Sequence, residues 1–220
     1  MFADGIYAVL FLCFCRCPGD LISAGTFFFP EAEPMKQNTK RIATIGVLTA
    51  LSVVLVALIH FPIFPAVAFL EYDPADIPIL ICGFAFGPAA GIIVTVIASV
   101  IQGFTVSAAS GIYGILMHVL ATGAYVAVSS LIYKKHKSKR GAVAALGFGT
   151  LAMVVVMFGA NLVITPYFMM NAVNSQTVGA VLQLMPFILL FNLIKAGLNG
   201  AVTFFIYKSI SGLITKVGAK

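Results

Sequence analysis

The fold depends on how one internal stretch is divided, residues 73–91, which read DPADIPILICGFAFGPAAG. Asp73 followed by Pro74 is typical of a helix start, with the acid as N-cap and the proline at the first helical position. Gly87-Pro88 is a strong breaker pair and predicts the end of that short helix. Two helices are therefore expected where hydropathy alone indicates one apolar run.

The same kind of turn signal divides the rest of the chain, which is almost continuously apolar after Arg41. Pro62 and Pro65 end the first helix, small residues separate the third from the fourth, and Pro166 ends the fifth. The segment from 63 to 73 is predicted to be a loop. The six helices are predicted at about 42–61, 73–87, 89–104, 112–133, 142–165 and 181–207.

The composition indicates a membrane protein, whose surface faces lipid. Of its 220 residues, 61% are hydrophobic and 9% are charged, whereas a soluble domain is about 45–50% apolar and about 25% charged. Residues 77–220 contain no acid, which excludes an enzyme with a carboxylate pair in that stretch. No phosphate-binding loop, nucleophile elbow or zinc-protease motif occurs. The sequence predicts an all-α, multi-pass membrane protein without catalytic activity of its own.

The positive charges predict its orientation. With six helices and the N-terminus inside, 11 of the 13 Lys and Arg residues fall in cytoplasmic segments: the start, the 134–140 loop and the tail. The three outer segments hold none. Both termini are therefore predicted to be cytoplasmic, in a bacterial plasma membrane. The net charge of +6 reflects this orientation and not binding to nucleic acid.

Residues 1–34 differ from the rest of the chain. The apolar run there has ten residues, too short for a span. The segment is predicted to be a dispensable leader, with residues 35–220 as the membrane-embedded domain. Its cysteines, Cys13, Cys15 and Cys17, lack the usual zinc spacing, so no metal site is expected.

Lys195 is the most informative residue. It lies 13 positions before Lys208, about 20 Å along a helix, too far to reach the inner surface. No acid occurs in the predicted spans after residue 76, so carbonyls, amides, water or a ligand must stabilise the ammonium. Asn192 and Asn199 share its helix face. A ligand contact is the preferred interpretation, and a wet groove open to the outside is the alternative.

Asn161 is predicted at a depth similar to that of Asn192, near the outer face. Amides both donate and accept hydrogen bonds, which suits a neutral polar heterocycle, although helix–helix bonding by Asn is equally common in membranes. Gln102 and Tyr113 are candidates for the same cavity. Asp73 and Asp76 are interpreted as helix-start groups, and His60 and His118 as hydrogen-bonded interior histidines.

The first helix carries small residues at Ala43, Gly46, Ala50 and Ala57. Such a stripe allows another helix to approach closely. Packing within the chain and docking of a partner explain it equally well.

Residues 35–220 resemble the substrate-binding S component of energy-coupling factor (ECF) transporters, in particular the riboflavin-specific type. The resemblance rests on Asp76-Ile-Pro78 with Phe86-Gly-Pro-x-x-Gly91, on Asn161 to Pro166-Tyr167, and on Asn192-Leu-Ile-Lys195. The region 106–113 matches the riboflavin type poorly.

The resemblance implies a six-helix vitamin binder without a cofactor, whose transported ligand is riboflavin. It implies that Asn161, Asn192 and Lys195 contact the ligand, with Tyr72 in a capping loop. Asn199 joins this set as part of the polar stripe of its helix. It also implies a membrane T subunit and two ATPases as partners, with Ala43, Gly46 and Ala50 in the docking surface.

Three alternatives remain open on the sequence alone. The same fold could bind another vitamin or small molecule. The protein could be a membrane assembly protein in which Asn and Lys only join helices. An intramembrane enzyme is disfavoured because no nucleophile–base pair or metal cluster is apparent.

Overall fold

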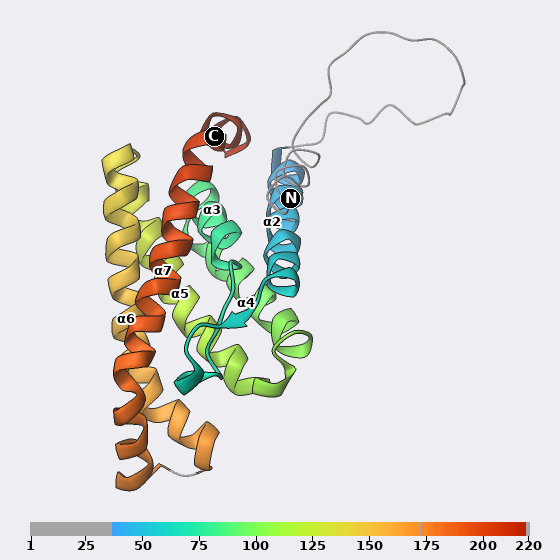
Figure 1. Ribbon diagram of the computed structural model, residues 1–220. Coiled ribbons are helices and arrows are strands. Elements are labelled where there is room, and N and C mark those ends of the chain that lie inside the picture. Colours follow the sequence, from blue (N-terminus) through green and yellow to red (C-terminus); the bar gives the residue numbers. More distant parts are fainter. Residues whose placement is uncertain (1–36, 172, 219–220) are drawn as a thin grey trace, which may run out of the picture. The chain divides into compact units, whose positions relative to one another are not determined.

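A computed structural model describes residues 37–171 and 173–218, and the predicted leader lies outside this range. Most of the described residues are α-helical, and the other regular elements are a small hairpin and two 3-10 turns (Figure 1). The helices are α2 (Gln37–Leu58), α3 (Asp76–Phe86), α4 (Pro88–Phe104), α5 (Gly111–Lys135), α6 (Lys139–Met170) and α7 (Ser175–Gly218). This confirms the all-α class.

Four of these helices, α2, α5, α6 and α7, are long and apolar enough to cross a membrane. Helices α3 and α4 are shorter, with 11 and 17 residues. Large apolar side chains such as Leu151 and Val155 on α6 and Leu193 on α7 are exposed, as expected for surfaces that face lipid. The chain is thus a multi-pass membrane protein, while the number of six spans stays a prediction.

The break inside residues 73–91 is confirmed. Gly87 has φ 93° and ψ 173°, a conformation that favours glycine, and Pro88 occupies the first turn of α4. The start of α3 is shifted: the helix begins at Asp76, and the Asp73 carboxylate accepts a hydrogen bond from the backbone N–H of Ala75 at 3.1 Å. The chain turns back at Gly87 and α4 returns along α3, since a Cβ at Gly91 would lie 3.1 Å from Cα of Gly83.

The prediction that Pro166 ends the fifth helix is wrong. Helix α6 continues through Pro166 to Met170 and is closed by Asn171 in the left-handed conformation. Proline leaves one carbonyl of the preceding turn without its amide partner. In a membrane, ending the helix there would leave many more backbone groups unpaired, so the helix continues.

Helix α7 begins at Ser175, six residues earlier than predicted. Asn174 caps it, because its side-chain oxygen accepts hydrogen bonds from the backbone N–H groups of Gln176 and Thr177. Both changes shorten the connection between α6 and α7 to the few residues that follow Met170.

The segment predicted as a loop after the first helix contains a hairpin. Strands β1 (Phe61–Pro62) and β2 (Glu71–Tyr72) pair antiparallel, with Phe61 opposite Tyr72. Between them, the 3-10 turn Pro65–Val67 buries Val67 in an apolar cluster with Val181 and Ile188 of α7. This packing anchors the hairpin to α7 and places the residues after Tyr72 beside that helix.

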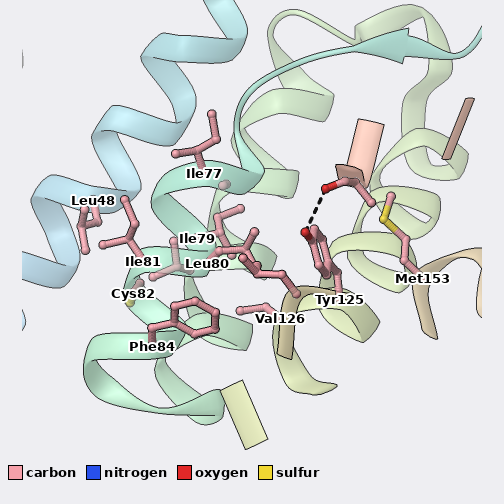
Figure 2. Close-up of a cluster of buried hydrophobic side chains, with 14 of the residues drawn as sticks. Leu48, Ile77, Ile79, Leu80, Ile81, Cys82, Phe84, Tyr125, Val126 and Met153 are labelled. Atoms are coloured by element: carbon pink, nitrogen blue, oxygen red, sulfur yellow. Dashed lines mark hydrogen bonds between the residues drawn. The ribbon is translucent and has the colours of Figure 1, made fainter. Parts of the chain in front are cut away.

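The main core surrounds α3 and α5 (Figure 2). Tyr125 of α5 is fully buried and donates a hydrogen bond to the carbonyl of Ala196 in α7 at 2.9 Å. Gly149 of α6 and Gly200 of α7 both lie against Tyr125, so that a Cβ at either position would collide with it. Helices α6 and α7 therefore both approach Tyr125 of α5 closely, which fixes how these three helices pack.

The connections alternate between two ends of the helical unit. The start of α2, the α5–α6 connection and the end of α7 lie at one end, and the hairpin and the α6–α7 connection lie at the other (Figure 1). The first three segments are those rich in Lys and Arg. Which end faces the cytoplasm stays a prediction from this charge distribution.

Candidate functional site

A cavity lies between the hairpin and helices α4, α5, α6 and α7, with about 760 Å³ of empty space, including the part open to the outside. Its polar lining comes from several elements: Glu71 and Asp73, Ser99 and Gln102, Ser107 and Ser110, His60 and His118, and Asn192 and Lys195. The apolar lining includes Phe69, Leu70, Met117, Met153, Met157 and Phe191.

Lys195 is paired with an acid, contrary to the interpretation from the sequence. Its Nζ lies 2.8 Å from Oδ2 of Asp73, and the residues are 6% and 2% exposed. The two are 122 positions apart in the chain. This acid comes from the loop before α3 and not from one of the later spans. The ligand is therefore not needed to compensate the charge of Lys195.

Asn199 holds the same loop against α7. Its Nδ2 donates to the backbone carbonyl of Asp73 at 3.0 Å and to Oδ2 of Asp76 at 2.9 Å, and its Oδ1 accepts from the Tyr72 hydroxyl at 2.9 Å. Asp76 also accepts from Thr122 of α5 at 2.6 Å. Asp73 and Asp76 are thus more than helix-start groups: they connect α3, α5 and α7.

The electrostatics of the loop follow from this pairing. Burial acts to raise the pKa of Asp73, but the Lys195 ammonium outweighs it, so the pKa lies below its ordinary value. Burial raises the pKa of Tyr72, and the neighbouring Asp73 carboxylate raises it further. Asp73 is therefore an anion and Tyr72 a neutral hydrogen-bond donor at neutral pH.

The structure brings Asn192 and Lys195 together but not Asn161. Asn192 lines the cavity, and its Nδ2 donates to the Ile188 carbonyl at 2.8 Å. Asn161 is fully buried and does not line it: its Nδ2 donates to the Met157 carbonyl at 2.7 Å. Its Oδ1 accepts from Thr165 at 2.8 Å.

Of the other candidates, Gln102 lines the cavity as predicted. Tyr113 lines a smaller neighbouring pocket, which shares Phe69, Leu70 and Met117 with the main cavity. His118 is hydrogen-bonded to Ser99 at 2.7 Å and lies on the cavity wall as well. Sequence reasoning missed the role of Ser99, although its spacing of three from Gln102 places both on one helix face.

The small residues of α2 are on its surface. Ala43, Gly46, Ala50 and Ala57 are all exposed, and a Cβ at Gly46 would meet no atom within 4 Å. The stripe therefore does not serve close packing within the described part of the chain.

Comparison with known proteins identifies the class. The family model "ECF transporter, substrate-specific component" matches residues 40–207, and the chain belongs to this family. A solved structure titled "Structure and mechanism of the S component of a bacterial ECF transporter" is similar, with a TM-score of 0.66 and 27% identity. The match covers 80% of this chain and 98% of that one.

Relatives within the family are named for riboflavin. The riboflavin transporter RibU of Staphylococcus aureus (strain TCH60) is 29% identical over 83% of this chain and 96% of its own length. The riboflavin transporter FmnP of Bacillus subtilis (strain 168) is 30% identical over 58% of this chain and 67% of its own length. RibU of Streptococcus thermophilus is 27% identical over 82% of this chain.

Proposed function

We propose that this protein is the riboflavin-binding S component of an ECF-type importer, a subunit that captures the vitamin and does not itself catalyse a reaction. The observation that carries the proposal is the cavity under the hairpin, lined by Asn192 and Lys195. It occurs in a chain of the S-component family whose similar relatives are named riboflavin transporters.

The ligand contacts follow from the free hydrogen-bonding capacity of the cavity wall. Asn192 uses one amide hydrogen within α7, and its carbonyl oxygen suits the ring N–H of a heterocycle. Lys195 uses one of its three N–H groups on Asp73, and the others suit ring carbonyl or nitrogen acceptors. Asn161 would join them after its amide turns away from the Met157 carbonyl. Tyr72 and Asn199 act by holding the loop that closes the cavity.

Binding of riboflavin to the purified protein tests the proposal directly, since the flavin's own fluorescence reports its environment. Asn192→Leu removes the amide at nearly constant volume, and we expect it to weaken binding by about 5- to 100-fold. Leu193→Ala, on the lipid-facing side of the same helix, is the matched control. A wild-type protein that binds another vitamin and not riboflavin would refute the proposed ligand. A protein that binds no small molecule would favour a structural role.

We further propose that a membrane T subunit and two ATPases supply the energy for release, and that α2 docks the T subunit. The support is the exposed stripe at Ala43, Gly46 and Ala50. Gly46→Leu should prevent assembly with the partners while leaving riboflavin binding intact. Gly147→Leu on α6, where a Cβ likewise meets no atom within 4 Å, is the matched control. Normal assembly of Gly46→Leu would refute this docking surface.

A further inference from the structure

A second polar wall of the cavity, built by α4 and α5, has two hydrogen-bonding atoms that the protein leaves unused. Gln102 and His118 both line the cavity. Among the described residues, Oε1 of Gln102 and Nε2 of His118 are buried without a hydrogen-bond partner. Buried polar atoms are almost always paired. Two unpaired atoms on one cavity wall therefore point to a ligand group that completes them.

The hydrogen bonds of Ser99 determine which role His118 plays. The Ser99 hydroxyl has a single hydrogen, which it donates to the Thr95 carbonyl at 2.6 Å. The 2.7 Å contact between Ser99 Oγ and His118 Nδ1 must then be a donation from the ring. A neutral imidazole protonated at Nδ1 presents a lone pair at Nε2. His118 is therefore a hydrogen-bond acceptor toward the cavity.

The neighbouring acid does not change this assignment. Oδ1 of Asp76 lies 3.9 Å from Nε2 of His118, beyond hydrogen-bond distance. The same oxygen already accepts the Thr122 hydroxyl at 2.6 Å.

Gln102 also presents an unused hydrogen-bond acceptor. Its Nε2 donates to the Ser107 hydroxyl at 3.4 Å, which leaves the carbonyl oxygen Oε1 as an acceptor. Two buried acceptors require donors. Hydroxyl groups are the neutral donors that match them, and a chain with several hydroxyls can reach both residues at once.

We propose that Gln102 and His118 bind the hydroxylated side chain of the ligand, while Asn192 and Lys195 of α7 bind its ring. This inference rests on the proposed function, and it assigns the sugar-alcohol chain of riboflavin to the α4–α5 wall. The two residues are then specificity determinants: they select a heterocycle that carries a polyol over the bare heterocycle.

Two flavins that share a ring separate the two walls: riboflavin, and lumiflavin, which has a methyl group in place of the polyol chain. The variants are Gln102→Leu and His118→Leu, and the control is Leu116→Met, at an exposed position of α5 outside the cavity lining. For each test variant we expect the dissociation constant for riboflavin to rise about 5- to 20-fold. The constant for lumiflavin should change less than about twofold.

Lumiflavin binding also shows that each variant is folded. Equal losses for both flavins, or no loss for either, would overturn the assignment while leaving riboflavin binding by the wild type intact. A wild-type protein that fails to bind riboflavin would instead refute the proposed function, and this inference with it.

Discussion

Replacing Asp73 by Asn isolates the buried ion pair that joins the capping loop to α7. Asparagine has the size of aspartate and keeps an oxygen that can accept the Ala75 N–H. It removes the negative charge 2.8 Å from Lys195 Nζ. At that distance and an effective dielectric constant of about 20, the attraction is roughly 6 kcal/mol. Removing one partner of a buried pair costs about 3–5 kcal/mol, because an uncompensated charge remains.

For a chain of this size, such a loss corresponds to a decrease in Tm of roughly 6–20 °C. A thiol-reactive dye can follow unfolding in detergent, since the free thiol of Cys82 is fully buried and the chain has no tryptophan. Serine at positions 13, 15 and 17 removes the leader thiols from the signal. The background protein with these three serines is the reference.

The double variant Asp73→Asn with Lys195→Met distinguishes the ion pair from a general effect of the site. Once both charges are absent, no buried charge is left unpaired, so at least half of the lost stability should return. The reasoning is refuted if Asp73→Asn melts within 2 °C of the reference. It is equally refuted if the double variant loses the sum of the two single losses.

The pH dependence of the pair has a definite sign. The folded-state pKa of Asp73 lies below its ordinary value of 3.8. The stability it contributes is therefore fully present above pH 3.8 and is lost as pH falls below that value through the folded pKa. The Tm difference between the wild type and Asp73→Asn should stay constant from about pH 5 to 8. A difference that collapses within that window contradicts the assignment.

Two further changes test the packing and the loop. Gly149→Ala places a Cβ against Tyr125, which should lower Tm by roughly 2–12 °C. Gly147→Ala is the control: its Cβ has no atom within 4 Å, so Tm should not change. Similar melting of the two variants would contradict the close approach of α5 and α6. Tyr72→Phe removes the hydroxyl that donates to Asn199, and titration should show about 2- to 10-fold weaker riboflavin binding. Tyr167→Phe, at an exposed position, is the control. Unchanged affinity of Tyr72→Phe would show that the loop is held without this bond.

Where local chemistry determines an element's end, the sequence predicted it closely. Gly87-Pro88 separates α3 from α4 as expected, because Gly87 takes a positive φ and Pro88 occupies the first turn of α4. The basic loop was predicted at 134–140, and α5 ends at Lys135 while α6 begins at Lys139. Pro166 misled the prediction because its local penalty is smaller than the cost of unpaired backbone in lipid.

The site was less accessible to such reasoning. Periodicity correctly placed Lys195 and Asn199 on one buried face of α7, but it says nothing about a partner 122 residues away. A deep lysine in a chain with seven acids was nonetheless a usable signal, since Asp73 lies just before α3 and Asp76 is its first residue. The position of an amide along a helix also does not determine where its side chain points. The sequence therefore could not show that Asn161 is bonded to its own helix.

The separation of Asp73 and Lys195 in the chain has a consequence for biogenesis. Membrane helices are inserted in the order of their synthesis, and α7 follows all the other described helices. Until it enters the bilayer, Asp73 lacks its cation and Asp76 lacks the amide of Asn199. An unfinished chain therefore lacks these partners for Asp73 and Asp76, and the buried polar network is completed only when the last helix arrives.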